Sequence, residues 1–148
     1  MNNWLPLLTT LFIQAMVSMA LLTLPVMAPV AAKNLAVSPA LVGVYVAITY
    51  LGAMISSLTS GTSVTRFGPI RVSQLGLMLC AMGLCLCAVP WLPATGLGAL
   101  LIGLGYGPIT PASSQILART TPPHQMSLVF SIKQTGVPLG SMLAGAIV

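Results

Sequence analysis

The chain has 148 residues, of which 57% are hydrophobic and only 3% are charged. It contains no Asp or Glu, one His and five Lys or Arg residues, which gives a net charge of +5. Soluble domains carry about 25% charged residues, so this composition excludes a soluble globular enzyme and a disordered tail. Nucleic-acid binding is excluded as well, because it needs cations clustered on a solvated face. The chain is therefore predicted to be an integral membrane protein in contact with the lipid bilayer.

The lack of carboxylates also excludes several kinds of site. Catalysis by paired carboxylates and carboxylate-bound Mg²⁺ or Ca²⁺ have no residues to use. A single histidine, His124, cannot build a typical zinc site and is interpreted as a loop residue. The three cysteines, Cys80, Cys85 and Cys87, share one apolar run and are interpreted as packing residues. We expect no enzyme activity, no cofactor, no metal and no catalytic residue.

Five apolar runs are long enough to cross a bilayer, which takes about 20 residues in a helix. Short connectors join them, so each predicted span is antiparallel to the next. The first run lacks a basic start and is too long for a secretory signal, although cleavage near Met27 is an alternative. The predicted fold is all-α, a polytopic transmembrane helix bundle forming one incomplete unit over residues 1–148, with spans at about 4–32, 39–60, 72–92, 97–117 and 126–148.

The connectors predict the orientation of the bundle. With the N-terminus inside, Arg66, Arg71 and Arg119 lie in cytoplasmic connectors and only Lys33 lies outside. Cytoplasmic loops carry an excess of Lys and Arg, so this orientation is favoured. We expect a bacterial inner (plasma) membrane protein with a cytoplasmic N-terminus.

The connector between the second and third runs carries Gly61, Arg66, Gly68 and Arg71. This pattern resembles the signature loop of the major facilitator superfamily (MFS), Gly-x-x-x-Asp-Arg-x-Gly-Arg-Arg/Lys. Gly61, Arg66 and Gly68 match in register, and Arg71 supplies a basic residue near the end. The chain has Thr65 where the family usually has Asp, so the family's charge relay at this loop lacks its acidic partner here.

Two further stretches support the resemblance. Residues 103–111 look like the family's glycine-rich fourth helix, and residues 133–140 look like its glycine- and proline-rich fifth helix. The resemblance implies the N-terminal portion of a twelve-helix secondary active transporter that moves small solutes by alternating access. The implied partners are a small-molecule substrate and the remaining helices of the full-length transporter. Alternatives are a five-helix membrane scaffold or assembly subunit, and a channel, for which residues 105–107 would need a re-entrant loop.

Polar residues at helical spacing indicate which faces avoid lipid. Thr10, Gln14 and Ser18 share one face of the first run, and Tyr106, Thr110 and Ser113 share one face of the fourth. Unpaired polar groups are costly in hydrocarbon, so these faces should point into the bundle or a wet cavity. Gln14, Tyr106 and Thr110 are candidates for substrate or gating contacts. The alternative is that hydroxyl groups bond their own helix and only assist packing. Both runs also carry paired prolines, at 25 and 29 and at 108 and 111.

Lys133 is the sharpest single candidate, with Gln134 beside it. It lies about eight positions into the fifth run, on a face that continues through Gly136, Gly140 and Ala144. A lysine at the bilayer centre costs roughly 2.5–3.5 kcal/mol on insertion scales, and no carboxylate of this chain can pair with it. If Lys133 contacts the substrate or a gate, its positive charge favours an anionic substrate. Snorkelling to the surface, or a structural pair with the missing half, is the alternative.

Overall fold

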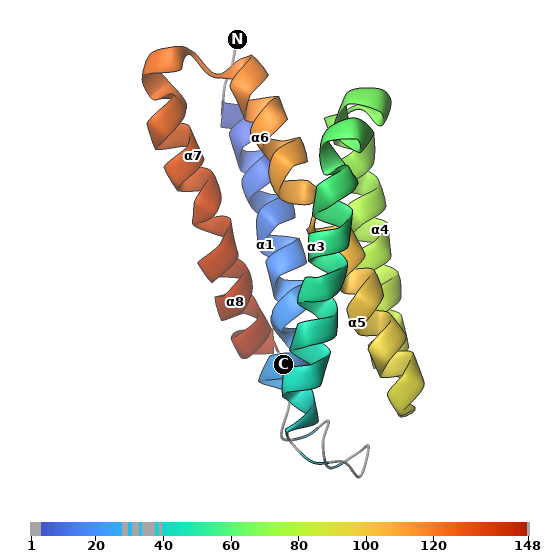
Figure 1. Ribbon diagram of the computed structural model, residues 1–148. Helices are drawn as coiled ribbons and strands as arrows, with labels where there is room; N and C mark the ends of the chain where they lie inside the picture. The colour runs from blue at the N-terminus through green and yellow to red at the C-terminus, as the bar shows by residue number, and fades with distance from the viewer. Residues whose placement is uncertain (1–3, 28–29, 31–32, 34–37, 39, 148) are drawn as a thin grey trace.

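The computed structural model describes residues 4–27, 30, 33, 38 and 40–147 (Figure 1). No strand occurs among these residues, so the predicted all-α class is confirmed. The end of the first predicted run and most of the first connector lie outside the described residues. The elements are α1 (Trp4–Val26), α3 (Leu41–Phe67), α4 (Pro69–Cys87), α5 (Leu92–Tyr106), α6 (Ile109–Thr120), the 3-10 helix η1 (Pro123–Gln125), α7 (Met126–Gln134) and α8 (Gly136–Ile147).

Four helical stretches of the described part are long and apolar enough to cross a bilayer. They are α1, α3, α4 and the stretch Leu92–Thr120, which contains α5 and α6. The fifth predicted run holds two shorter helices, α7 and α8, which follow one another along α1 (Figure 1). Thr135, the residue between them, keeps helical backbone angles, with φ −64° and ψ −15°. The fifth pass is therefore an interrupted helix and not a separate kind of structure.

The connector predicted over residues 61–71 is wrong in extent. α3 continues to Phe67 and α4 begins at Pro69, so most of the matching segment is helical. Apolarity ends near residue 60 but the helix does not, because helical hydrogen bonding does not require a lipid environment. The polar side chains also bond their own helix: the Thr65 hydroxyl donates to the carbonyls three and four residues earlier, each at 3.0 Å.

Gly68 is the single residue between α3 and α4. Its backbone has φ +83° and ψ 152°, a region that is open essentially to glycine alone. Pro69 follows at the start of α4, where its missing N–H leaves no helical hydrogen bond unmade. The chain therefore passes from α3 to α4 at this one residue, which is a tighter turn than a connector of several residues.

The connector predicted at residues 93–96 is also wrong, because these residues form the first turn of α5. Pro93 fits this turn, since an N–H there would have no partner within the helix. The chain instead reverses between Cys87 and Leu92. The fourth pass likewise extends beyond the predicted residue 117, to Thr120.

α1 runs through the middle of the bundle, between α7–α8 on one side and α3, α4 and α5 on the other (Figure 1). Small residues let α8 pack closely on it. A Cβ atom at Gly136 would lie 2.8 Å from the carbonyl oxygen of Leu11, and one at Gly140 would overlap the carbonyl oxygen of Ala15. Ala144 on the same face is fully buried. Close approach of this kind is how helices associate where lipid provides no hydrophobic driving force.

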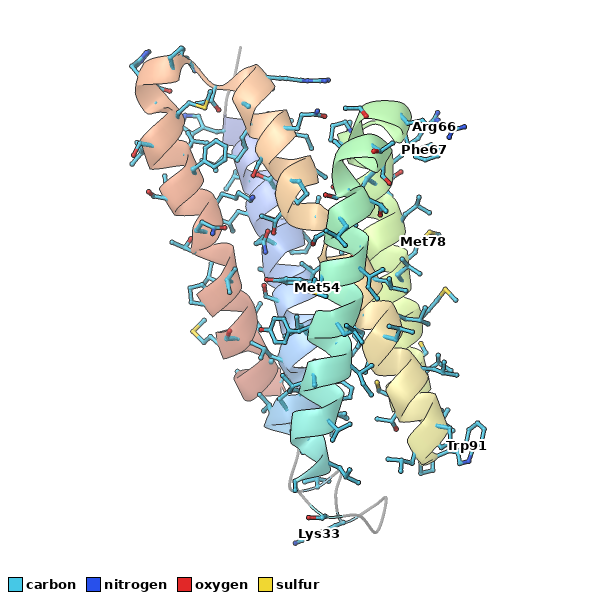
Figure 2. All side chains as sticks on the ribbon, in the orientation of Figure 1. Lys33, Met54, Arg66, Phe67, Met78 and Trp91 are labelled. Carbon is cyan, nitrogen blue, oxygen red and sulfur yellow. The ribbon has the colours of Figure 1, made fainter. Side chains whose placement is uncertain are left out.

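The two ends of the bundle differ in the residues they display. Arg66 and Phe67 lie at the end where α1 starts, and Lys33 and Trp91 lie at the opposite end (Figure 2). Between the ends the outer surface is apolar, with side chains such as Met78 pointing outward and 65% exposed. An apolar belt between two polar ends matches the lipid environment predicted from composition.

Candidate functional site

Two apolar clusters lie at different levels along α1. The smaller one joins Leu7, Leu117 and Val129, from α1, α6 and α7. On α1, Thr10 and Gln14 lie between Leu7 of this smaller cluster and Val17 of the larger one, and each is only 1% exposed. Polar side chains are therefore enclosed between two apolar regions. The larger cluster is built around Val17, Ala20, Leu21, Cys80, Ile102 and Ile109.

Lys133 enters this enclosed level from α7. Its side chain is 1% exposed, and it is the largest fully buried side chain among the described residues. The ammonium reaches across to α6, where Nζ donates to the carbonyl oxygen of Thr110 at 3.2 Å and to the Ser114 hydroxyl at 3.1 Å. A buried ammonium is thus held by two neutral oxygens. We call Thr10, Gln14, Thr110, Ser114 and Lys133 the polar layer.

The polar face predicted on α1 is buried, as expected. Thr10 and Ser18 are 1% and 2% exposed. The Thr10 hydroxyl donates to carbonyl oxygens of its own helix, at Pro6 (2.9 Å) and Leu7 (3.0 Å), which is the packing behaviour of a membrane threonine. Among the described residues, neither the buried Oε1 atom of Gln14 nor the buried Ser18 hydroxyl has a hydrogen-bond partner. Unmet polar groups in an apolar core cost free energy, so Gln14 and Ser18 stand out from Thr10 on this face.

The other predicted candidates fall in different places. Tyr106, the last residue of α5, is half-buried and lies close to Ser18 of α1 and Tyr50 of α3. Thr110 contributes its backbone carbonyl to Lys133, while the residue itself is exposed. Gln134 is exposed on α7 and is not brought to the polar layer. Lys133, Thr110 and Gln14 are therefore gathered around one level, and Gln134 is not.

Sequence reasoning missed two residues of α6. Ser114 accepts the Lys133 hydrogen bond, and Gln115 buries its Oε1 atom without a partner in the described part of the chain. Ser114 lies four residues after Thr110, one helical turn along the same face, so the spacing held a signal. The polar face predicted for this run contained Ser113 instead, whose hydroxyl donates to the carbonyls of Ile109 and Thr110 in its own helix.

Helix interruptions occur next to the polar layer. α5 ends at Tyr106 and α6 begins at Ile109, and Pro108 and Pro111 lack the N–H groups that would continue the helical ladder. Of the two prolines in the first predicted run, Pro25 lies in the last turn of α1, and the proline at position 29 lies outside the described residues. The interrupted fourth and fifth passes meet through Lys133, so helix interruptions and a buried charge occur together.

The segment that carries the family pattern lies at the end where α1 starts. Gly61 is exposed on α3, and a Cβ atom there would meet nothing within 4 Å. The Arg66 guanidinium lies 5.4 Å from the centre of the Phe67 ring, a cation–π distance. Arg71 is exposed in the first turn of α4. This segment is separate from the polar layer, and its distinctive geometry is the turn at Gly68.

Comparisons with known proteins place the chain in a family. The model of the Major Facilitator Superfamily matches residues 7–148. A relative from Mycobacterium tuberculosis (strain ATCC 25618 / H37Rv), named "Multidrug resistance protein B homolog", is 32% identical over 120 residues. That match takes in 72% of this chain but only 22% of the relative, and no solved structure matches significantly. With nearly its whole length matched, this integral membrane chain belongs to the major facilitator superfamily, a family of transporters rather than enzymes.

Proposed function

We propose that the chain is part of a secondary active transporter that moves a small solute by alternating access, with the polar layer on the solute path. Family membership and the apolar spans support a transporter in a membrane. The observation that carries the proposal is the burial of Lys133 between two apolar clusters, on the join between two interrupted helical passes. Intramembrane ionisable residues mark substrate or ion pathways by default, because they are costly to keep.

The charge of Lys133 favours an anionic solute. The chain has no Asp or Glu, and the two acceptors of the ammonium are neutral oxygens. Burying an unpaired charge is expensive, and a well-packed apolar side chain fills such a place at lower cost. A cation kept in that position fits a negatively charged group that arrives from elsewhere, either on the solute or on helices outside this chain.

A second candidate is transport of drug-like solutes. It rests on the 32% identity to the relative named as a multidrug resistance protein. Channel function is not favoured, because residues 105–107 lie at the end of α5 within the helical stretch Leu92–Thr120 and not in a re-entrant loop. A five-helix scaffold is not favoured, because a well-packed apolar side chain would join α6 and α7 at lower cost than a buried charge.

We also propose that the start of α1, the Arg66–Arg71 turn and the Arg119–Gln125 turn face the cytoplasm of a bacterial cell. Arg66 lies at one end of the bundle and Lys33 at the other, which fits the rule that basic residues stay inside (Figure 2). Trp91, 61% exposed at the Lys33 end, fits an aromatic anchor at the outer interface.

Uptake into proteoliposomes tests the proposed function. The gene product that carries this chain is purified, reconstituted and given radiolabelled benzoate, its neutral analogue benzamide, and the cation ethidium. Benzoate uptake above that of protein-free vesicles, without benzamide uptake, supports an anion transporter. Ethidium movement alone supports the drug-transport candidate. Uptake of none of the three under an imposed proton or sodium gradient contradicts both.

A further inference from the structure

Lys133 and Ser114 form a clasp between two helices that are otherwise joined through apolar contacts. The ammonium has three N–H donors, and two of them go to Thr110 and Ser114 on α6. Nearer the end of the bundle, the same helices meet in the cluster of Leu7, Leu117 and Val129. Within the described residues, the third donor has no acceptor and stays available to a further oxygen.

The segments joined by the clasp are ends of interrupted passes. α6 starts just after the break at Gly107 and Pro108, and α7 ends just before Thr135. A helix segment beside such a break can tilt without unravelling the rest of its pass, because the ladder of backbone bonds is already interrupted there. Whatever holds or releases Lys133 therefore controls how firmly α6 and α7 move together.

The two acceptors of the Lys133 ammonium differ in how they can bond after the ammonium leaves. Thr110 offers a backbone carbonyl that also accepts from Ser113 at 3.0 Å, and it belongs to the helix whether or not Lys133 is present. Ser114 offers a hydroxyl that can turn to a carbonyl of its own helix when the ammonium leaves, as Ser113 does at 2.7 Å to Ile109. Release from Ser114 thus leaves no buried oxygen unpaired.

We propose that Ser114 is a positioning residue that holds the Lys133 ammonium on α6, and that a carboxylate competes for it and loosens α6 from α7. This inference rests on the proposed function, because it assigns the chemistry and the coupling of the same polar layer. The ammonium donates a charge-assisted bond in either case, but a carboxylate adds the attraction of opposite charges, which is strong away from water, so it displaces the hydroxyl. The carboxylate belongs to the solute or to a helix outside this chain.

A matched pair of variants tests the clasp. Ser114→Ala removes the hydroxyl that receives Lys133, while Ser113→Ala removes a neighbouring hydroxyl that bonds only its own helix. In the reconstituted protein, Ser114→Ala should lower the KM for benzoate roughly 3- to 10-fold, the effect of one lost competing hydrogen bond. Ser113→Ala should leave this KM unchanged, and Ser114→Thr, which keeps the hydroxyl, should restore the KM of the unmodified protein.

A second measurement does not depend on transport. Spin labels at Arg119→Cys on α6 and Leu128→Cys on α7, both exposed positions, report the distance between the helices by pulsed electron resonance in a cysteine-free background. Ser114→Ala should broaden the distance distribution, and Ser113→Ala should not. Benzoate should broaden it in the protein with Ser114 intact if the solute supplies the carboxylate. An effect of Ser114→Ala that is equal with and without benzoate, at unchanged KM, assigns the carboxylate to helices outside this chain.

The outcomes separate this inference from the proposed function. If Ser114→Ala and Ser113→Ala behave alike in both measurements, the clasp is overturned even when benzoate is transported. If the distances respond to Ser114→Ala but the vesicles take up no probe, the clasp stands and the transport proposal fails. Because either alanine removes one oxygen from a helix surface, the amount of protein in the membrane is checked first. Ser114→Gly, which also lacks the hydroxyl, replaces Ser114→Ala if the alanine variant does not accumulate.

Discussion

Gly83 of α4 and Gly98 of α5 exclude a side chain from one another. A Cβ atom on Gly83 would lie 2.7 Å from the carbonyl oxygen of Gly98, and one on Gly98 would lie 2.6 Å from the carbonyl oxygen of Gly83. One end of the α4–α5 interface is therefore a contact of backbone with backbone. Gly76 and Gly105 repeat this arrangement toward the other end of the same interface.

This contact predicts a strong position dependence among the glycines of α5. Gly98→Ala should destabilise the protein by about 1–3 kcal/mol, because the neighbouring backbone cannot move aside as a flexible side chain would. Gly96→Ala is the matched control, since a Cβ atom there meets nothing within 4 Å and alanine favours the helix. Thermal unfolding in detergent, followed by loss of the monodisperse peak, measures both. Equal melting temperatures for the two variants would contradict the backbone contact.

A second pair of variants tests the turn at Gly68 between α3 and α4. Gly68→Val should cost about 1–3 kcal/mol, because a β-branched residue is forced into the positive-φ backbone that joins α3 to α4. Gly61→Val changes the other glycine of the family pattern, but on an exposed helical face with free space around it. We expect normal amounts of the Gly61 variant and reduced amounts or slowed transport for the Gly68 variant. The turn would be unimportant if both variants melted and transported alike.

The apolar runs predicted where the helical stretches lie, because the bilayer imposes their length on the sequence, although the fifth run holds two shorter helices and not one long span. They did not predict the helix ends. α3 continues seven residues beyond the predicted residue 60, since hydrogen bonding and the Thr65 side chain sustain it without apolar surface. The inward face of Gln14 was predictable from spacing alone. The role of Ser114 was not, because the choice between Ser113 and Ser114 depends on where α7 sits, and that is set by contacts far along the chain.

The proposed orientation predicts opposite labelling at the two ends of the bundle. In a cysteine-free background, Arg71→Cys should react with an impermeant maleimide only after the cells are permeabilised. Trp91→Cys, at the end that carries Lys33, should react in intact cells (Figure 2). Both residues are exposed, so differences in reaction arise from the side of the membrane and not from burial. Reaction of Arg71→Cys in intact cells would reverse the orientation.

Gln14 predicts a variant that separates stability from transport. Its Oε1 atom is buried without a partner among the residues that the structure describes, so Gln14→Leu replaces an unsatisfied polar group by an apolar one of similar size. Such an exchange is nearly neutral or stabilising, and the melting temperature should not fall. Uptake should nevertheless drop severalfold if the amide contacts the solute, while Gln125→Leu, an exposed change in η1, should not affect it. Normal uptake by Gln14→Leu would leave this amide a packing role only.

A variant at Lys133 should also separate stability from transport, with a larger effect on transport than the Gln14 variant. Lys133→Met keeps most of the side-chain volume and removes the charge, and Thr110 and Ser114 can satisfy their oxygens within α6. Because a buried charge without a carboxylate partner is costly, the melting temperature of this variant should stay the same or rise.

Transport should respond in the opposite direction. Lys133→Met and Lys133→Ala should weaken the apparent affinity for an anion such as benzoate by tenfold or more, because the positive charge is lost. Lys133→Arg should retain only part of the affinity for benzoate, since it keeps the charge but replaces a compact ammonium by a planar guanidinium. Lys33→Met, a change of the exposed lysine at the opposite end, controls for net charge. Normal benzoate affinity in Lys133→Met, together with a lower melting temperature, would show that the lysine serves packing and not the solute.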